Sequence, residues 1–198
     1  MKRYFHLSAI SKIAAIIALP DESQGLFENA NCNLHFCGIG KVNAAFTAAE
    51  IILKHGYTHL INLGTAGSQK FPTHTLVECS ALVQRDMDLS PLGFPLGVTP
   101  FDSLSSSLDI DTFFTQLPRG ICGTGDHFAT GAPALPCDLV DMEAYAIAKV
   151  CKKLGVGFTA IKYISDGSDH NAHNDWAGNL PRAAEGLFAV FESITSNT

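Results

Sequence analysis

Short apolar segments alternate with amphipathic helical segments along this chain, and the alternation limits the folds that it can adopt. Strands are predicted at residues 13–19, 34–37, 59–63, 75–83, 120–122 and 158–164. Helices are predicted at residues 43–55, 139–154 and about 180–193. Such alternation is typical of α/β proteins, in which helices cover both faces of a sheet. We therefore expect a single domain over residues 1–198, folded as a three-layer α/β/α sandwich with a central twisted mixed sheet.

The composition indicates a globular protein that binds neither nucleic acid nor a membrane. Hydrophobic residues make up 46% of the chain, charged residues 16%, and the formal net charge is -6. No basic stretch exceeds two consecutive residues, which argues against a nucleic-acid backbone as partner. The apolar run before Pro20 is about seven residues long, whereas a membrane span needs roughly 20. Six cysteines without a CxxC pair predict reduced thiols and a cytoplasmic location.

An acid stands in the apolar stripe of the predicted helix at residues 139–154. The first member of that stripe is Glu143, and its further members are Ile147, Val150, Cys151 and Leu154. A carboxylate that faces a core is costly unless something pairs with it, and the hydroxyls of a ligand would do so. The alternative is that Glu143 is a first-turn acid favoured by the helix dipole.

A second acid, Asp166, follows the predicted strand at residues 158–164. Glu22 and the glycine turns at 38–40, 64–67 and 123–126 also come just after predicted strands. In α/β folds, ligands bind at the C-terminal ends of the strands. We therefore expect these residues to meet in one cleft, where two inward acids suggest chemistry on a polar small molecule.

The motifs argue against an organic cofactor or a metal. The glycine turn at residues 38–40 lacks the third glycine of a dinucleotide fingerprint, and no GxxxxGK[ST] segment exists. His170 and His173 have no third ligand at a suitable spacing, so we interpret them as part of a solvated loop. No GxSxG nucleophile elbow is present either.

Five segments together resemble the nucleoside phosphorylase/nucleosidase superfamily. They are GIGKVNAA (38–45), INLGTAG (61–67), GDHF (125–128), VDMEAYAIAKVC (140–151) and ISDGSD (164–169). Within that superfamily the chain looks most like the bacterial 5′-methylthioadenosine/S-adenosylhomocysteine nucleosidases, over about residues 13–191. It is shorter than the usual member, and the shortening falls between residues 101 and 120.

The resemblance implies roles for several polar residues. Asp166 matches the general acid that protonates the leaving base, and Ser165 orients it. Glu143, with Met142, matches the pair that holds the ribose hydroxyls. Glu22 matches the glutamate that activates water, whereas its position after Pro20 taken alone favours an acid at a helix N-terminus.

The resemblance also implies an apolar substrate pocket. Phe128 matches the ring that stacks on adenine, the backbone of Ala129 contacts N6, and Trp176 covers the 5′ substituent. Leu19, Leu89, Leu92 and Phe94 match the apolar lining of the 5′ pocket. Some of these loop residues are contributed across a dimer interface in the family.

Three positions depart from the usual patterns. Superfamily phosphorylases place an arginine where this chain has Asn62, and only Arg3, Arg85, Arg119 and Arg182 are present, so a phosphate clamp is hard to build. The nucleosidases usually have arginine at the position of Lys162, and lysine lacks the planar fork. Thr65 replaces the serine usual in its turn and keeps the hydroxyl.

We therefore expect a soluble cytoplasmic hydrolase that cleaves the N-glycosidic bond of 5′-modified adenine nucleosides. No cofactor is implied. The alternatives are a purine nucleoside phosphorylase, a futalosine-type hydrolase and a catalytically silent nucleoside-binding protein. The loop at residues 89–101 exposes Leu92, Phe94, Leu96, Val98 and Phe101, which predicts an isologous homodimer that completes the neighbour's 5′ pocket.

Overall fold

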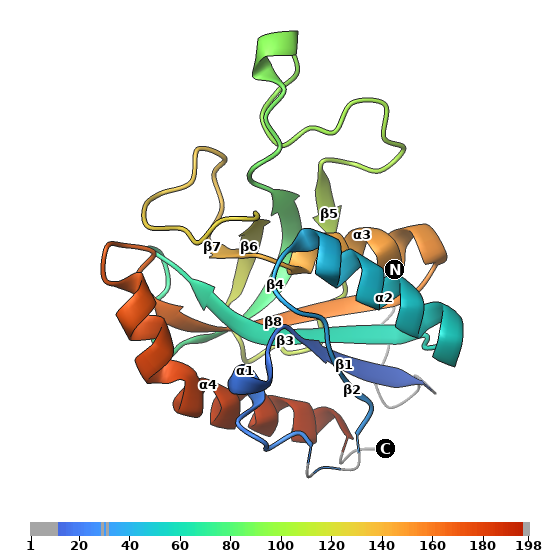
Figure 1. Ribbon diagram of the computed structural model, residues 1–198, viewed down its shortest axis with the longest axis vertical. Helices are drawn as coiled ribbons and strands as arrows, with labels where there is room; N and C mark the ends of the chain where they lie inside the picture. The colour runs from blue at the N-terminus through green and yellow to red at the C-terminus, as the bar shows by residue number, and fades with distance from the viewer. Residues whose placement is uncertain (1–11, 29, 31, 196–198) are drawn as a thin grey trace.

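The computed structural model describes residues 12–28, 30 and 32–195 (Figure 1). The ends of the predicted domain, residues 1–11 and 196–198, lie outside the described residues. An eight-stranded sheet forms the centre, and helices cover both of its faces. The predicted α/β class and the central mixed sheet are therefore confirmed. Among the described residues, no helix combines the length and the apolar character that crossing a membrane requires.

The predicted strands and helices appear in the predicted order. The strands are β1 (Ile13–Ile17), β2 (Leu34–Phe36), β3 (His59–Gly67), β4 (Leu76–Gln84), β5 (Ser107–Asp109), β6 (Arg119–Thr124), β7 (Leu139–Asp141) and β8 (Gly157–Asp166). The helices are α1 (Pro20–Ser23), α2 (Lys41–His55), α3 (Ala144–Leu154) and α4 (Ala172–Thr195), with a short 3-10 helix, η2 (Ser90–Leu92). Of these, α1, η2, β5 and β7 are additional elements that the pattern did not predict.

The sheet is mixed and partly closed. Its strands lie in the order β2-β1-β3-β7-β6-β4-β5, and β8 pairs with both β3 and β4. The pairings of β3, β7, β6, β4 and β8 thus form a closed ring. β8 runs parallel to β3 and antiparallel to β4. The strands β1, β2, β3 and β8 are mutually parallel, so their C-terminal ends meet at one edge of the sheet.

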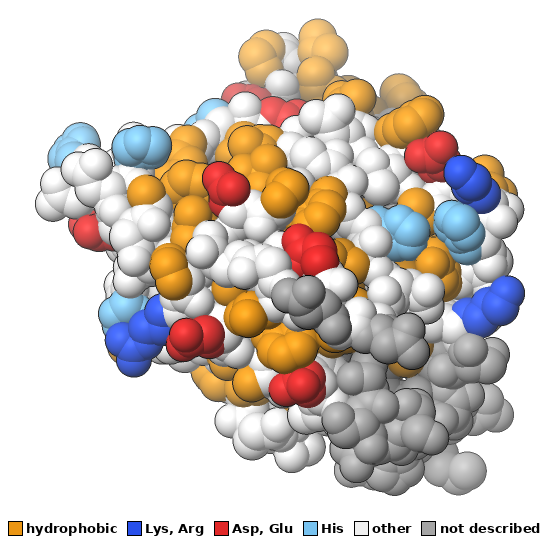
Figure 2. All heavy atoms as spheres, turned by 60° about the horizontal axis from the view of Figure 1, so that its bottom comes forward, with side chains coloured by type: hydrophobic (Ala, Val, Ile, Leu, Met, Phe, Trp, Pro, Cys, Tyr) orange, Lys and Arg blue, Asp and Glu red, His pale blue; other side chains and the backbone are white. Residues whose placement is uncertain are grey.

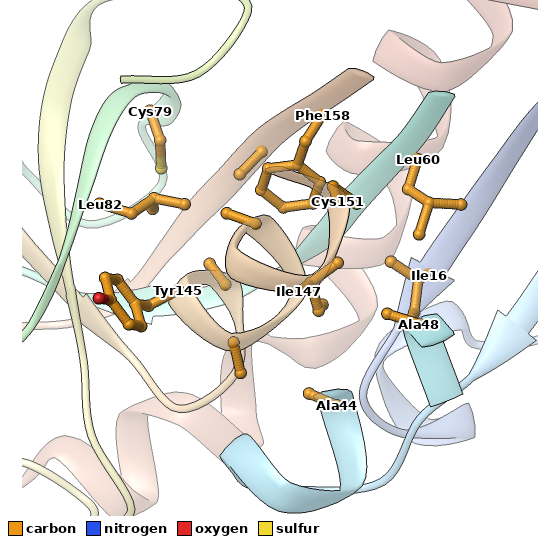
Figure 3. Packing of buried hydrophobic residues seen from close by; sticks show 14 of the residues in the cluster. Ile16, Ala44, Ala48, Leu60, Cys79, Leu82, Tyr145, Ile147, Cys151 and Phe158 are labelled. Atoms are coloured by element: carbon orange, nitrogen blue, oxygen red, sulfur yellow. The ribbon is translucent and has the colours of Figure 1, made fainter. Parts of the chain in front are cut away.

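One core lies between the sheet and the helices α2 and α3 (Figure 3). Small residues of α2, Ala44 and Ala48, are fully buried and let this helix approach Ile147 and Cys151 of α3 closely. Each fully buried isoleucine contributes roughly 1.5–3 kcal/mol. The opposite face of the sheet is covered by α4, where Phe27 contacts the rings of Phe188 and Phe191 from that helix.

The predicted start of the helix at residues 139–154 is wrong. Residues Leu139–Asp141 form β7, which pairs in parallel with β6, and α3 begins only at Ala144. A three-residue buried strand directly before an amphipathic helix extends the helical pattern by chance. The predicted helix end is correct, because Gly155 adopts φ 69° and its N–H donates to the Cys151 carbonyl.

Three other boundaries differ from the prediction. β3 continues through the predicted turn at residues 64–67, since its glycines and Ala66 pair with β8. β8 likewise includes Asp166 as its last residue. The final helix begins at Ala172, not near residue 180, so His173 lies on α4 and the predicted loop around it is wrong. Pro181 stands inside α4, and such a residue usually marks a helix start, which explains the late prediction.

Candidate active site

A pocket of about 210 Å³ opens where the C-terminal ends of the strands meet. Most of the predicted site residues line it, although they come from six separate parts of the chain. They are Leu19, Glu22, Thr65, Phe128, Ala129, Met142, Glu143, Ser165, Asp166 and Trp176. Four predicted residues are not part of its wall in this chain, namely Leu89, Leu92, Phe94 and Lys162.

Asp166 is the last residue of β8, and its carboxylate is held at both oxygens. The Ser165 hydroxyl donates to Oδ2 at 2.8 Å, and the N–H of Ser168 donates to Oδ1 at 2.9 Å. The residue is only 4% exposed. Burial raises the pKa of Asp166 above its ordinary value, and the two hydrogen bonds oppose that rise. The arrangement suits a carboxyl group that keeps a proton to higher pH than a surface aspartate does.

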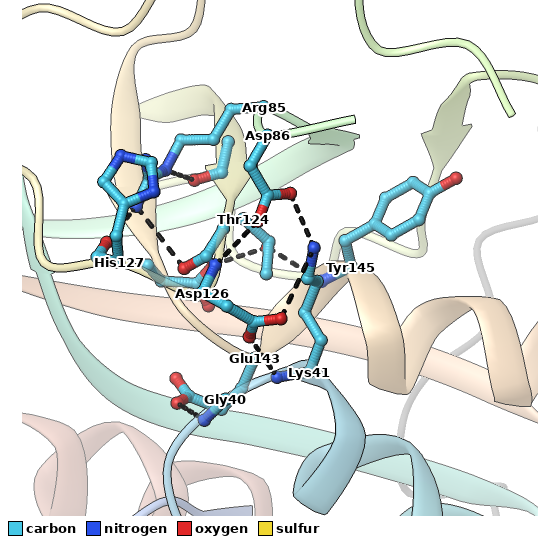
Figure 4. Close-up of polar contacts among 12 residues, drawn as sticks. Gly40, Lys41, Arg85, Asp86, Thr124, Asp126, His127, Glu143 and Tyr145 are labelled. Atoms are coloured by element: carbon cyan, nitrogen blue, oxygen red, sulfur yellow. Dashed lines mark hydrogen bonds and ion pairs between the residues drawn. The ribbon is translucent and has the colours of Figure 1, made fainter. Parts of the chain in front are cut away.

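Glu143 follows β7 and occupies the N-cap position of α3, yet its side chain does not cap that helix. The first N–H groups of α3 are bound by Asp141 and by the Thr124 hydroxyl, at 2.9 Å each. The Glu143 carboxylate instead accepts from the N–H of Gly40 at 2.8 Å, across the pocket edge (Figure 4). Glu143 thus stands at the N-terminus of α3 without making a capping hydrogen bond to it.

The pKa of Glu143 is raised to about 7. Burial is the largest cause, and the nearby negative charge of Asp141 adds to it. Lys162 and the Gly40 N–H act in the opposite direction. Glu143 is 7% exposed and lines the pocket, so its carboxylate could accept from the hydroxyl groups of a ligand.

Lys162 lies beneath the pocket and forms a fully buried ion pair with Asp141. Its Nζ is 2.8 Å from Asp141 Oδ2. Burial alone would raise the pKa of Asp141, but the charge of Lys162 outweighs it and holds that pKa below its usual range. Burial in turn opposes the charged form of Lys162, and attraction by Asp141 overcomes this and raises its pKa. The pair is therefore ionised.

Glu22 connects α1 to Thr65 of β3, and both residues line the pocket. Its Oε1 accepts from the N–H of Thr65 at 2.9 Å and from the Thr65 hydroxyl at 2.7 Å. Its Oε2 accepts from the N–H of Leu19 at 3.3 Å, so the same carboxylate also caps α1. A Cβ on Gly64 would lie 3.4 Å from Glu22 Oε1 and 3.5 Å from Lys162 Nζ. Glycine at this position thus lets both charged groups approach β3.

An aromatic wall closes one side of the pocket. Trp176 Nε1 donates to the Thr65 hydroxyl at 3.0 Å, which fixes α4 against β3. The ring of His173 is stacked on Trp176 with a centroid distance of 6.4 Å. Phe128 meets the His173 ring edge-on at 6.4 Å and is 44% exposed. Three aromatic rings thus line this side of the pocket.

Sequence reasoning missed a polar network at the pocket rim. Lys41 pairs with Asp86 at 2.6 Å, and the N–H of Lys41 donates to Asp126 at 2.7 Å (Figure 4). The N–H of Asp126 donates in turn to Asp86 at 2.8 Å. The network joins the loops after β4 and β6 to the start of α2. Its signal in the sequence is the placement of both acids directly after strand ends.

Arg85 and His127 also line the pocket without having been predicted. The Arg85 guanidinium donates to the carbonyls of Gly123 and His127, and it lies 2.6 Å from His127 Nε2. Its nitrogens are therefore engaged by backbone carbonyls and by the His127 ring. The other arginines in the described part of the chain lie elsewhere: Arg119 pairs with Glu78, and Arg182 is exposed on α4. Asn62 is buried and donates to the Ile16 carbonyl.

The fold and the pocket define an enzyme with nucleoside phosphorylase-like architecture. A solved 5′-methylthioadenosine/S-adenosylhomocysteine nucleosidase from Neisseria meningitidis superposes with a TM-score of 0.82 at 25% identity, over 94% of this chain and 99% of that one. An aminodeoxyfutalosine nucleosidase of Helicobacter pylori is 28% identical over 82% of this chain and 78% of its own. A 5′-methylthioadenosine/S-adenosylhomocysteine nucleosidase of a Marinomonas species is 29% identical over 86% and 83% of the two chains.

The phosphorylase superfamily model matches residues 23–196. This chain belongs to the phosphorylase superfamily. The resemblance inferred from the five sequence segments is thereby confirmed.

Proposed function

We propose that this protein is an N-ribosyl hydrolase that cleaves 5′-modified adenine nucleosides, such as 5′-methylthioadenosine and S-adenosylhomocysteine, to adenine and a 5′-thioribose. The observation that carries the proposal is the Asp166 carboxyl group. It is buried in the pocket, its pKa is raised, and both of its oxygens are held by neighbouring groups. Names of this activity among similar proteins support the same assignment.

Asp166 acts as the general acid. Cleavage of an N-glycosidic bond leaves electrons on the base, and a proton delivered to N7 makes the base a better leaving group. The raised pKa keeps a proton on the carboxyl group closer to neutral pH. Ser165 and the Ser168 N–H hold it in one orientation.

Glu143 holds the ribose. Its carboxylate lies at the pocket floor with one oxygen bound to the Gly40 N–H, and the other is available to sugar hydroxyls. As the bond to the base breaks, the sugar gains positive charge, and the ionised carboxylate stabilises it. Met142 precedes Glu143 and supplies an apolar contact in the same wall.

Glu22 activates the attacking water. Its carboxylate is fixed by Thr65 and lines the pocket. The Lys162–Asp141 pair lies below and holds β8 against the β7–α3 junction, so Lys162 acts on the site through Asp141. The described arginines do not provide two free guanidinium groups in the pocket, which favours water over phosphate as the nucleophile.

Phe128 stacks on the base, and the backbone of Ala129 contacts its N6 group. Trp176 and Leu19 form the apolar surface for the 5′ substituent. A second candidate substrate is an aminodeoxyfutalosine-type nucleoside, because relatives of that name match this chain at similar identity. The two candidates share the base and the ribose and differ only in the 5′ substituent.

A homodimer completes the 5′ pocket. Leu92 and Phe101 are 71% and 99% exposed on the loop that projects at the top of Figure 1. Hydrophobic side chains also crown this projection in the space-filling view (Figure 2). On α2, the side chains of Val42, Phe46 and Leu53 form a further exposed apolar stripe. Such a surface is larger than a monomer usually leaves in contact with water, and one self-complementary patch closes under twofold symmetry.

The proposed setting is the cytoplasm, in salvage of the methionine-derived nucleoside. Chromatography of a substrate panel tests the activity and the 5′ preference together. The panel contains adenosine, 5′-methylthioadenosine, S-adenosylhomocysteine and aminodeoxyfutalosine. We expect adenine release from at least one 5′-modified nucleoside at a higher kcat/KM than from adenosine. Tight binding of these compounds without any release of base would instead indicate the silent binding protein.

A further inference from the structure

The Ser168 hydroxyl is buried, unpaired and next to the proposed general acid. Ser168 is 2% exposed and lines the pocket. Among the described residues, its Oγ has no hydrogen-bond partner, and neither do Asn62 Oδ1 and Thr99 Oγ1. Of these three atoms, only that of Ser168 belongs to a residue of the pocket wall. A buried hydroxyl without a partner keeps its full desolvation penalty, so the native protein is expected to use it.

The protein does not need this hydroxyl to hold Asp166. The Ser168 backbone N–H makes that contact, and a residue of any type would provide it. The Ser168 carbonyl accepts from Gln69 Nε2 at 3.4 Å, which fixes the loop from its other side. The φ of Ser168 is 49°, a region that glycine and asparagine adopt more readily than serine. The serine side chain therefore brings a cost here and no partner within the described protein.

The hydroxyl and the Asp166 carboxylate lie against the same point of β3. A Cβ added to Gly67 would clash with the Ser168 hydroxyl and would lie 2.6 Å from Asp166 Oδ1. Only a glycine leaves room for both oxygens there. A ligand edge that reaches the Asp166 carboxyl group is therefore within reach of the Ser168 hydroxyl as well.

We propose that the Ser168 hydroxyl contacts the 6-substituent of the purine and lets the site accept 6-oxo as well as 6-amino nucleosides. This inference rests on the proposed function, in which Asp166 protonates N7. N7 and the 6-substituent share one edge of a purine. A serine hydroxyl both donates and accepts, so it accepts from a 6-amino group and donates to a 6-oxo group. Ser168 is thus a specificity-determining residue for the base.

The test compares two nucleosides that differ only at position 6, 5′-methylthioadenosine and 5′-methylthioinosine. We expect the wild-type protein to release base from both. In Ser168→Ala, kcat/KM for the 6-oxo nucleoside should fall about tenfold more than that for the 6-amino nucleoside. The 6-oxo group loses its donor, whereas the 6-amino group keeps its contact with the Ala129 backbone.

Ser168→Gly is the matched second variant, because glycine lacks the hydroxyl and tolerates the positive φ. If the hydroxyl reads the 6-substituent, the ratio of the kcat/KM values for the 6-oxo and 6-amino nucleosides should change equally in both variants. The ratio is measured within one preparation, so partial unfolding cancels.

A wild-type protein that cleaves only the 6-amino nucleoside, or an unchanged ratio in both variants, would overturn the inference. An unchanged ratio would indicate that the hydroxyl acts in the neighbouring cleft, which is lined by Ser68, Gln69 and Lys70. Release of base from neither nucleoside, in this test and in the substrate panel alike, would instead remove the proposed function, and this inference with it.

Discussion

The pocket floor and the projecting loop at residues 89–101 depart from ordinary globular proteins in opposite ways. The floor, with Glu143 and Asp166, and Lys162 beneath it bury charge: each of these residues is at most 7% exposed. The loop exposes apolar side chains, and Leu92 is 71% exposed at its tip. Buried charges and exposed apolar patches are the informative exceptions to the usual distribution of residues.

The two regions differ in whether the chain itself pairs their buried charges or covers their exposed apolar side chains. The Lys162–Asp141 pair is complete within the protein, and backbone N–H groups bind Glu143 and Asp166. The floor still has raised carboxyl pKa values, which a cationic or hydroxyl-bearing ligand would relieve. The apolar tip of the loop has no comparable cover within the described residues. We therefore expect a small molecule to bind at the floor, and the proposed homodimer would cover the loop.

The largest expected effect comes from removing the acid of the floor. Asp166→Asn should lower the rate of base release by about 10²–10⁴-fold, the usual range for general acid catalysis. The amide keeps the shape of the side chain, so nucleoside binding should change much less. Steady-state kinetics with 5′-methylthioadenosine, and a binding titration, separate these two quantities.

Asp109→Asn is a matched control, since Asp109 is exposed at the end of β5, away from the pocket. We expect wild-type kinetics from it. Wild-type turnover from Asp166→Asn would remove this residue from the mechanism.

A charge introduced into the loop should change the oligomeric state and the activity together. Leu92→Asp places a charge in the proposed interface, so the protein should become monomeric and lose about tenfold or more in kcat/KM, because the neighbour's 5′ pocket loses apolar contacts. Sedimentation at low micromolar concentration and kinetics of the same samples measure both effects. Leu154→Asp makes the same change at an exposed position on α3 and should leave both unaltered. A wild-type protein that is a fully active monomer would contradict the comparison.

Glu143 should give the floor a distinctive dependence of stability on pH. The pKa of Glu143 is about 7 in the folded protein, above the ordinary value of 4.5. Its contribution to the free energy of unfolding is therefore fully present below pH 4.5 and is lost as pH rises through 7. The free energy of unfolding should thus fall by about 1–3 kcal/mol between these limits. His59 acts oppositely below pH 6.5, because burial lowers its pKa to about 4.

The difference between wild type and Glu143→Gln in urea unfolding isolates the Glu143 contribution. The variant should gain stability relative to wild type as pH rises from 5 to 8, while its nucleoside binding weakens. Glu50→Gln, an exposed site on α2, should keep the wild-type pH dependence. A constant difference between wild type and Glu143→Gln across this range would mean that Glu143 is not a strained, ligand-facing acid.

The sequence predicted the floor better than its surroundings. Gly56 and Gly155 end α2 and α3 because glycine adopts positive φ at low cost, and this signal is local. Asp166 and Glu143 were found because acids after apolar segments break a clear pattern. The predicted single domain and the roles of the site residues stay predictions, although the fold brings most of those residues into one pocket.

The parts that were missed depend on contacts between distant segments. The strand Leu139–Asp141 is too short to show its own period, and only its pairing with β6 and β3 defines it. The burial of Lys162 against Asp141 joins residues that no local pattern links. The same holds for Arg85, whose guanidinium is bound by carbonyls about 40 residues away along the chain, as the separations of 38 and 40 for Gly123 and Gly125 show.

Phosphate dependence is the most direct test of the proposed hydrolysis. Purified protein is incubated with 5′-methylthioadenosine in phosphate-free buffer and again with added phosphate, and base and sugar products are separated by chromatography. Hydrolysis predicts the same rate of adenine release in both buffers and a sugar product without phosphate. Adenine release that requires phosphate, together with a sugar 1-phosphate, would contradict the account and identify a phosphorylase.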